Sequence, residues 1–188
     1  FSKGQAEALE TRQAGRSKVF LASMNFKNYI AEIPDFPKPG IGFKDISPLL
    51  KDAEVFAKVI TQLGDLLDLS KVDQFAGIES RGFIFAAALA VQFKKGFLPI
   101  RKVGKLPPPT RKLKYQLEYG SAEIEVQTGQ GRIVILDDVL ATGGTLAAAV
   151  QLSRDAGYMV TDVAVLIDLT FLNQMQFNNQ KIKSLIQY

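Results

Sequence analysis

The sequence predicts an α/β fold in which a parallel sheet is flanked by helices. Two observations carry this prediction: strand and helix patterns alternate from Asp52 onward, and the strand expected at residues 133–136 is purely apolar. Apolar strands that alternate with helices are typical of parallel sheets covered on both faces. In such sheets, ligands bind at the carboxyl ends of the strands. A length of 188 residues fits one domain, and no internal repeat is present.

The first elements of this alternation lie between Asp52 and Ile100. Asp52 can cap a helix whose apolar side chains fall largely on one face, namely Val55, Val59, Ile60, Leu63 and Leu67. A strand is expected at residues 72–78. Residues 82–93 are apolar nearly all round and rich in alanine, which suits a buried helix packed closely on the sheet. A short strand is expected at residues 97–100.

The second half of the alternation begins at the strand 133–136, which runs into Asp137 and Asp138. A turn that contains glycine follows, and then a helix closed by Gly157. The apolar positions of this helix are Leu146, Ala149, Val150 and Leu152. A last buried strand is expected at residues 163–169.

Residues 114–126 interrupt the alternation with a period of two, which predicts a β-hairpin. Tyr115, Leu117 and Tyr119 share one face, and Gln116 and Glu118 share the other. After a turn expected at Gly120-Ser121, the apolar Ile124 and Val126 lie opposite Glu123 and Glu125. Three prolines at 107–109 precede the hairpin, so we expect it to project from the core, as decoration or as a lid. The basic residues beside it favour the lid.

Composition excludes several classes of chemistry. The chain is 47% hydrophobic and 22% charged, as expected of a globular protein rather than a disordered one. It contains no Cys and no His, which excludes disulfides, thiolate nucleophiles, His-dependent triads and the usual zinc sites. No apolar run approaches the roughly 20 residues of a membrane-spanning helix. Residues 1–23 are expected to be an extension, and residues 24–188 a single domain.

Basic residues are concentrated in one part of the chain. Residues 94–114 hold eight basic side chains and no acidic one: Lys94, Lys95, Arg101, Lys102, Lys105, Arg111, Lys112 and Lys114. Such a stretch is typical of a solvated loop, a nucleic-acid surface or a polyphosphate site. The motif described next favours a polyphosphate ligand.

The segment VILDDVLATGGT, residues 134–145, contains the clearest site pattern. A buried strand delivers two adjacent carboxylates, and the five residues Ala141, Thr142, Gly143, Gly144 and Thr145 then lead into a helix. Free backbone amides and the helix dipole form a phosphate cradle there, and carboxylates are suitable acceptors for the hydroxyls of a diol. An ordinary strand-to-helix turn explains the glycines equally well. The acidic pair favours a ligand, because two carboxylates at one buried strand end repel each other. Phosphate beside a diol suggests a ribose 5-phosphate.

VILDDVLATGGT resembles the phosphoribosyl diphosphate (PRPP) motif of type I phosphoribosyltransferases. Four further segments are similar to the adenine phosphoribosyltransferases within that family: IPDFPKPGIGFKDISPLL at 33–50, GIESRGF at 77–83, IRKVGKLP at 100–107 and YQLEYG at 115–120. The segments occur in the order of the family, and the resemblance runs from about Met24 to Tyr188. It implies the type I phosphoribosyltransferase fold, with a projecting hairpin lid and a small hood. The unbroken run Pro107-Pro108-Pro109 departs from the family pattern.

The resemblance also implies a role for each matching residue. Ala141 to Thr145 would bind the 5-phosphate, and Asp137 and Asp138 the ribose hydroxyls. The diphosphate would be bound by Ser80, Arg81, Arg101, Lys102 and Lys105. The adenine would be bound by Ile41, Phe43, Lys44 and Leu169. Glu118 would handle a proton at the base, and Arg81 would assist catalysis.

The implied reaction converts adenine and PRPP into AMP and pyrophosphate, as in purine salvage. It implies Mg²⁺ as cofactor, held through PRPP and water rather than directly by the protein, and a cytoplasmic homodimer without nucleic-acid or membrane partners. Alternative interpretations are a transferase for another purine and a PRPP-binding regulator without catalysis. A nucleic-acid binder would explain the basic stretch but would leave the acidic pair without a role.

Overall fold

The computed structural model describes residues 24–117 and 120–188, apart from the side chain of Leu117. These residues form two compact units, of which the first ends at Lys58 and the second runs from Val59 to Tyr188. No helix within the described residues is long and apolar enough to cross a membrane.

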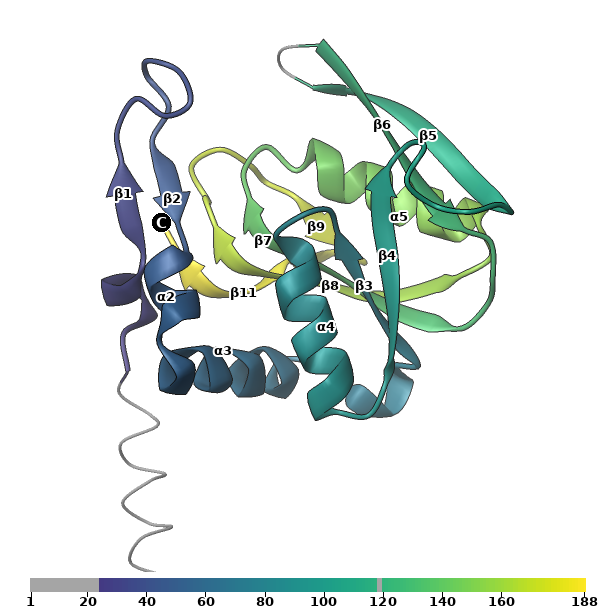
Figure 1. Ribbon diagram of the computed structural model, residues 1–188, viewed down its shortest axis with the longest axis horizontal. Helices are drawn as coiled ribbons and strands as arrows, with labels where there is room; N and C mark the ends of the chain where they lie inside the picture. The colour runs from purple at the N-terminus through teal and green to yellow at the C-terminus, as the bar shows by residue number, and fades with distance from the viewer. Residues whose placement is uncertain (1–23, 118–119) are drawn as a thin grey trace, which may run out of the picture. The chain divides into compact units, whose positions relative to one another are not determined.

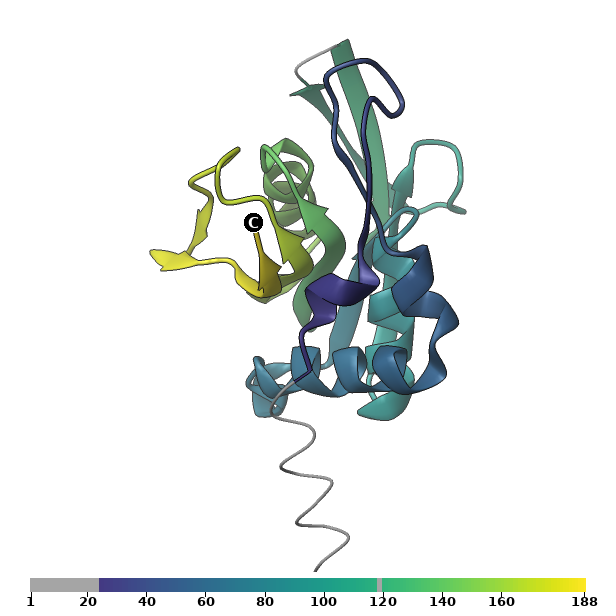
Figure 2. The same cartoon turned by 90° about the vertical axis from the view of Figure 1, so that its left-hand side faces the viewer.

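The first unit is built around a short antiparallel ribbon. A 3-10 helix, η1 (Phe26–Tyr29), precedes β1 (Ala31–Ile33), and β1 pairs with β2 (Phe43–Asp45) so that Ile33 lies opposite Phe43. The loop between these strands extends beyond their ends (Figures 1 and 2). Helix α2 (Ser47–Lys51) follows, and α3 (Ala53–Asp65) begins in this unit.

Asp52 confirms the predicted helix start. Its Oδ1 accepts hydrogen bonds from the backbone N–H of Glu54 and of Val55, both at 3.1 Å. This is the usual way in which a side chain satisfies the free donors of a helix N-terminus. The predicted apolar face is also confirmed, since Val55, Val59 and Leu63 are buried.

The second unit contains a seven-stranded sheet in the order β11-β8-β7-β3-β4-β6-β5. All neighbours from β11 to β4 are parallel, and β4–β6 and β6–β5 are antiparallel. The strands of this sheet are β3 (Gln74–Ile78), β4 (Gly96–Lys102), β5 (Thr110–Leu117), β6 (Gly120–Gln127), β7 (Arg132–Leu140), β8 (Met159–Asp168) and β11 (Lys183–Gln187). The predicted parallel sheet is therefore confirmed.

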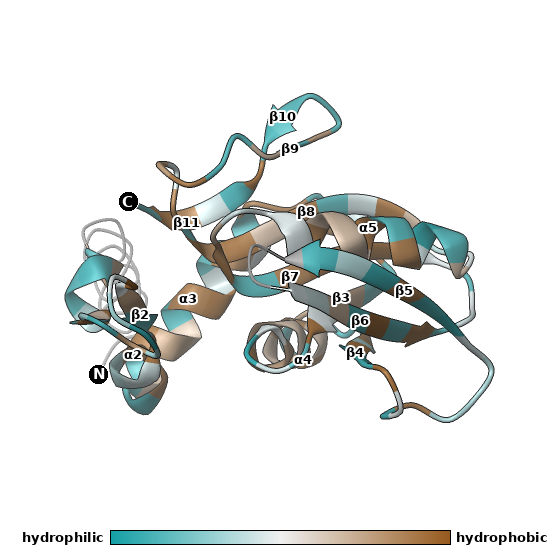
Figure 3. Cartoon of the chain, turned by 90° about the horizontal axis from the view of Figure 1, so that it is seen from above, coloured by the Kyte–Doolittle hydropathy of each residue, from teal (hydrophilic) through white to brown (hydrophobic). Residues whose placement is uncertain are grey.

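Helices cover both faces of this sheet, as predicted. Figure 3 shows α4 (Gly82–Gln92) and α5 (Gly144–Asp155) on opposite sides of it. Between them the sheet is apolar, and Phe75, Ile135 and Leu136 are fully buried. The prediction that α4 is buried nearly all round is wrong at Val91, whose exposed fraction is 83%. The remaining elements are η2 (Leu69–Lys71), β9 (Gln176–Phe177) and β10 (Gln180–Lys181).

The predicted hairpin exists as β5 and β6, but its root belongs to the sheet. Arg101 and Lys102 of β4 pair with Glu125 and Ile124 of β6, and Ile124 and Val126 are buried in the core. Residues 120–123 continue beyond the end of β4, so only this tip projects, as Figure 1 shows. The turn predicted at Gly120-Ser121 is wrong, because both residues begin β6 and pair with Leu117 and Gln116.

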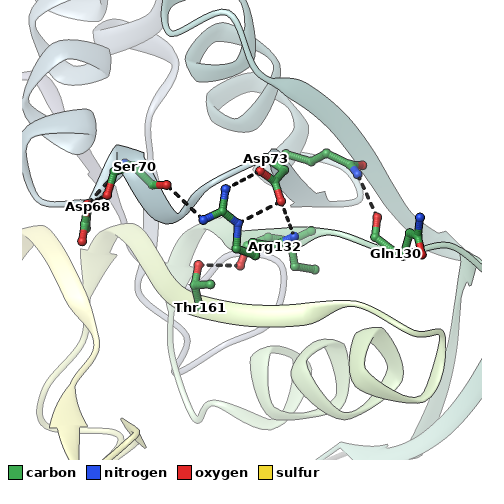
Figure 4. A network of polar contacts seen from close by, with 8 residues as sticks. Asp68, Ser70, Asp73, Gln130, Arg132 and Thr161 are labelled. Atoms are coloured by element: carbon green, nitrogen blue, oxygen red, sulfur yellow. Dashed lines mark hydrogen bonds and ion pairs between the residues drawn. The ribbon is translucent and has the colours of Figure 1, made fainter.

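A polar network joins the amino ends of β3 and β7 (Figure 4). The carboxylate of Asp73 accepts hydrogen bonds from the backbone N, Nε and Nη2 of Arg132 at 2.8, 3.0 and 2.7 Å. Arg132 Nη1 donates to the carbonyl oxygen of Ser70 at 3.0 Å. These bonds fix the register between β3 and β7 at the amino ends of the strands. Ligands are expected at the opposite, carboxyl ends.

Candidate active site

The carboxyl ends of β7, β3 and β4 lie side by side, because these three neighbours are parallel. Residues 141–143 follow β7, residues 79–81 follow β3, and residues 103–109 follow β4. The tertiary structure thus brings to one end of the sheet three segments of which, by the resemblance, one is expected to bind the 5-phosphate and two the diphosphate of one ligand.

The segment after β7 forms a small phosphate-sized hollow. Gly143 caps α5 with φ of 88°, in the left-handed region that favours glycine. A Cβ at Gly143 would also lie 3.1 Å from the sulfur of Met175. The resulting cavity of about 90 Å³ is lined by residues 139–146 together with Asp137. Since free backbone N–H groups at the start of α5 face this region, the loop is suited to an anion.

Asp137 and Asp138 lie on β7 directly before that loop. The backbone N–H of Asp138 donates to Asp137 Oδ1 at 2.9 Å, and Asp138 Oδ2 forms an ion pair with Arg81 Nε at 2.8 Å. Burial raises the pKa of Asp137 well above its ordinary value, and the negative charge of Asp138 adds to this shift. Burial also raises the pKa of Asp138, although the positive charge of Arg81 opposes that rise. The site therefore holds two carboxylates whose ionised forms are poorly stabilised by the protein itself.

The start of α4 comes very close to this acidic pair. A Cβ at Gly82 would lie 2.6 Å from the carbonyl oxygen of Leu136 and 3.1 Å from Asp137 Oδ1. Glycine is therefore required at this position, because any side chain would push α4 away from β7. The close approach accompanies the ion pair between Arg81, which directly precedes the helix, and Asp138, and Ser80 precedes Arg81 in the loop after β3.

The cations expected to bind a diphosphate lie on and after β4. Arg101 donates from Nη2 and Nε to the two carboxylate oxygens of Glu79, at 2.9 and 3.2 Å, and the backbone N–H of Lys102 donates to Glu79 Oε2 at 3.0 Å. Hydrogen bonds from Arg101 hold the pKa of Glu79 below its ordinary value. Lys102 and Lys105 are exposed. Glu79, for which the sequence predicted no role, thus holds the Arg101 side chain and the backbone of Lys102.

A cavity of about 430 Å³ lies between the end of β4, the start of α5 and the hairpin. Its lining includes Glu79, Lys102, Thr145 at the start of α5, and Tyr115 from the hairpin. The hydroxyls of Tyr115 and Thr145 are 3.3 Å apart, which is within hydrogen-bond distance. The hairpin therefore contacts the phosphate loop directly, consistent with the predicted lid.

The predicted adenine-binding residues belong to different units. Ile41, Phe43 and Lys44 lie in the first unit, where the rings of Phe36 and Phe43 pack edge to face at 5.1 Å and Lys44 forms an ion pair with Glu32. Leu169 lies in the second unit, is 7% exposed, and donates from its backbone N–H to the carbonyl oxygen of Leu140 at 2.9 Å. Their joint role stays a prediction.

Two further glutamates complete the account of the predicted residues. Glu118, the predicted proton-handling group, lies outside the described residues. Glu125 shares a face of β6 with Glu123, as predicted, but it is only 1% exposed whereas Glu123 is exposed. No sequence signal separates Glu125 from Glu123, because the two share one face of the strand and differ only in what packs against them.

Comparison with known proteins agrees with this geometry. The family described as "Phosphoribosyl transferase domain" matches residues 46–174 and so spans both units. An adenine phosphoribosyltransferase of Bdellovibrio bacteriovorus is 62% identical over 165 residues, which cover 88% of this chain and 100% of that protein. A homologue from Kosmotoga olearia with the same name is 43% identical over 170 residues, covering 88% of this chain and 100% of its own.

The fold of this chain is also similar to that of solved adenine phosphoribosyltransferases. The crystal structure of adenine phosphoribosyltransferase from Thermoanaerobacter pseudethanolicus has a TM-score of 0.81 and 45% identity, and covers 87% of this chain and 98% of that chain. The enzyme from Saccharomyces cerevisiae has a TM-score of 0.76 and 32% identity, with coverage of 86% and 95%. Similarity to these enzymes in sequence and in fold thus extends over most of the chain. This chain belongs to the adenine phosphoribosyltransferases, which are enzymes of the phosphoribosyltransferase family.

Proposed function

We propose that this protein transfers the phosphoribosyl group of PRPP to adenine, which gives AMP and pyrophosphate. The observation that carries the proposal is the cavity of about 430 Å³, since it is lined by Lys102 of β4, by Thr145 at the start of α5 and by residues of the hairpin. The Saccharomyces cerevisiae relative was crystallised with adenine and an imino-altritol bisphosphate, and the Giardia lamblia relative with 9-deazaadenine. A purine and a doubly phosphorylated sugar mimic are ligands that such a cavity suits.

Each part of the ligand has a proposed binding segment. Ala141 to Thr145 bind the 5-phosphate through backbone N–H groups and hydroxyls. Asp137 and Asp138 accept hydrogen bonds from the ribose hydroxyls. The diphosphate is bound by Ser80, Arg81, Arg101, Lys102 and Lys105. Adenine is bound by Ile41, Phe43, Lys44 and Leu169.

The residues present also fit Mg²⁺. Among the described residues, no group of three or more His, Cys, Asp or Glu side chains could hold a metal ion, and Asp137 and Asp138 are two adjacent carboxylates on β7. Mg²⁺ usually keeps several waters and binds one or two carboxylates together with substrate phosphates. We propose that it is held through PRPP and water. When bound, Mg²⁺ neutralises charge on the leaving diphosphate.

The chemistry demands three contributions from the chain. A ring nitrogen of adenine forms a bond to the anomeric carbon as the bond to diphosphate breaks, through an oxocarbenium-like state. Arg81 and the cations near β4 stabilise the departing negative charge. The hairpin excludes water, which would otherwise hydrolyse PRPP. Glu118, on the same hairpin, is the proposed acceptor of the proton that adenine loses, because the chain offers no histidine for this role.

We further propose that residues 24–188 act as one domain, with residues 1–23 as an extension, and that the protein is a cytoplasmic homodimer. The family match at 46–174 runs across the boundary at Lys58, which supports a single functional domain. Val91 and Phe97 are exposed apolar side chains on α4 and β4, and the Phe97 ring packs against Phe83 at 5.5 Å.

A panel of bases tests the function. Purified protein is incubated with PRPP, Mg²⁺ and adenine, hypoxanthine, guanine or no base, and the nucleotide formed is quantified. We expect AMP from adenine and little nucleotide from the other bases. Product from a different purine would support a transferase for that base, whereas PRPP binding without any nucleotide would support a regulator.

A further inference from the structure

Glu125 is a carboxylate within the described chain for which the proposed chemistry has no role. It lies on β6, and its exposed fraction is 1%, in contrast to Glu123 two residues earlier, which is exposed. Glu125 Oε1 accepts hydrogen bonds from the backbone N–H of Lys105 at 2.7 Å and of Leu106 at 2.8 Å. Two adjacent donors from a turn therefore converge on a single oxygen of a buried acid.

The charge of Glu125 is maintained by that turn. Burial raises its pKa, but hydrogen bonds from the backbone of Leu106, Lys105 and Gly104, together with the positive charge of Lys112, outweigh burial, and the pKa lies below its ordinary value. A buried charge is costly unless it is hydrogen-bonded, so a fold that needed only packing here would use an apolar residue. The arrangement suggests that the turn, rather than the core, requires this carboxylate.

The turn at residues 103–106 carries Lys105, one of the cations of the proposed diphosphate site. It follows β4 directly, contains Gly104 in the left-handed region at φ of 86°, and presents Lys105 as its next residue. At its start, Arg101 is held by Glu79, and Arg101 Nη1 donates to the carbonyl oxygen of Lys105 at 3.4 Å. Arg101 and Glu125 are also paired across β4 and β6.

We infer that Glu125 is a positioning residue for the diphosphate part of the site. Glu125 fixes the turn at residues 103–106, so that Lys105 and Arg101 are presented to the same leaving diphosphate. The two glutamates hold the turn at both ends: Glu79 binds the guanidinium before it, and Glu125 binds the backbone within it. Preorganised cations lose less freedom when they bind an anion, so a loose turn would weaken the diphosphate contacts selectively. This inference rests on the proposed function, which assigns Lys105 to the diphosphate.

Glu125→Gln is the principal test, because glutamine keeps the size of the side chain and an oxygen that can accept both N–H groups while removing the charge. We expect KM for PRPP and the dissociation constant of pyrophosphate to rise about fivefold to tenfold, since hydrogen bonds to a charged acceptor are roughly twice as strong as neutral ones. KM for adenine is expected to stay within about twofold, because the base contacts do not involve this turn. Glu54→Gln, an exposed glutamate in the first turn of α3, is the control and should leave every constant unchanged.

Lys105→Ala and the double variant with Glu125→Gln separate the possible failures. Because Glu125 acts partly through Lys105, the loss of pyrophosphate affinity in the double variant is expected to be smaller than the sum of the two single losses, and a fully additive loss would overturn the positioning role. An unchanged pyrophosphate affinity in Lys105→Ala would overturn the diphosphate assignment in the proposed function. A weakened Lys105→Ala beside a Glu125→Gln variant with normal PRPP and pyrophosphate constants would overturn the positioning role.

A purely structural role predicts a different result. Glu125→Gln would then lower Tm while KM for PRPP and KM for adenine changed together or not at all, and this outcome also overturns the inference. Pyrophosphate titrations by calorimetry, carried out well below the Tm of each variant, keep the affinity readout independent of folding.

Discussion

The carboxylates that lie near the two ends of strand β7 have opposite pKa shifts. The first residue of β7, Arg132, binds Asp73, and Asp137 and Asp138 lie near its last residue. At the amino end, Asp73 accepts three hydrogen bonds from Arg132, and these bonds hold its pKa well below the ordinary value although it is exposed. At the carboxyl end, burial raises the pKa of Asp137 and of Asp138, and one ion pair to Arg81 does not offset this rise.

The difference shows which end of the sheet is stabilised by its own contacts. In the amino-end network, both carboxylate oxygens of Asp73 accept hydrogen bonds from Arg132, and these bonds contribute to the stability of the fold. The carboxyl end concentrates negative charge in a region with few internal donors, which is typical of functional sites. Under the proposed function, we expect its carboxylates to gain hydroxyl groups or a hydrated cation as partners when the ligand binds.

Replacement of both aspartates at the carboxyl end should have the largest effect. We expect Asp137→Asn with Asp138→Asn to lower kcat/KM by about a thousandfold, because the ribose hydroxyls lose both charged acceptors. Tm should hold or rise, since a buried pair of like charges is removed. Kinetics and thermal melts check the two statements, and near-wild-type activity would refute the ribose assignment.

The next largest effect is expected at the hairpin. Glu118→Gln keeps the shape and hydrogen-bonding capacity of the side chain but removes its basicity, so kcat should fall by about a hundredfold with little change in PRPP binding. Glu123→Gln, on the same hairpin, is the comparison, and Glu54→Gln is the control away from the site. Equal losses from Glu118→Gln and Glu123→Gln would show that Glu118 has no special part in the reaction.

Arg81 links the acidic pair to the proposed diphosphate site, so Arg81→Ala tests whether the two are coupled. The loss of one charge-assisted contact is worth roughly 1.5–3 kcal/mol, and we expect PRPP and pyrophosphate to bind roughly tenfold to over a hundredfold more weakly. Adenine binding should change much less. If adenine binding fell while PRPP affinity held, the two subsites would be the reverse of our assignment.

At the amino end, the same kind of substitution should affect stability alone. Asp73→Ala removes the acceptor of the Arg132 backbone N–H and of its guanidinium, so Tm should fall, while kcat and both KM values stay within about twofold of wild type. Thermal melts and steady-state kinetics of one preparation are sufficient. A large loss of activity in a stably folded Asp73→Ala protein would contradict the separation of the two ends.

The pH dependence of stability should differ in sign between the two ends, and this is the smallest expected effect. The pKa of Asp73 is lower in the folded protein, so its contribution is present above its unfolded value of 3.8 and is lost as the pH falls through the folded pKa. The pKa of Asp137 is higher in the folded protein, so the free energy of unfolding decreases as the pH rises from 3.8 toward the folded pKa.

Melts of wild type and both variants between about pH 3 and about pH 7 measure this difference. The deficit of Asp73→Ala should be largest at neutral pH and shrink in acid. The advantage of the Asp137→Asn, Asp138→Asn protein should grow as the pH rises. Parallel curves for both variants would mean that neither pKa shift contributes to stability.

Local patterns were sufficient to predict most elements of the sheet and its helices. The cap at Asp52, the apolar start of β7 and the turn into α5 were predicted correctly, because each depends on residues close together in the sequence. Strands β4, β7 and β8 were predicted too short, and β7 in particular was expected at residues 133–136 but extends to Leu140. β9 and β10 were not predicted, because Gln, Asn and Lys dominate residues 173–183 and obscure any period, and β11 was not predicted either.

The hairpin shows where local reasoning fails. Period two correctly places Glu123 and Glu125 on one face of β6, but exposure depends on what covers that face. β4 ends opposite Ile124, and the turn after β4 donates its N–H groups to Glu125, so Glu125 is buried while Glu123 stays exposed. That outcome depends on the register between strands about 20 residues apart in the sequence.

The amino-acid sequence by itself determined the alternation of strands and helices, the glycine-containing loop at residues 141–145 and the adjacent acidic pair, because contiguous residues form each of them. Only the tertiary structure decided that Arg81 pairs with Asp138, that Glu79 holds Arg101, and that Glu125 supports the turn carrying Lys105. These contacts join residues from different strands and loops. Their geometry follows from strand order, register and the close approach of α4 to β7 at Gly82, none of which a local pattern encodes.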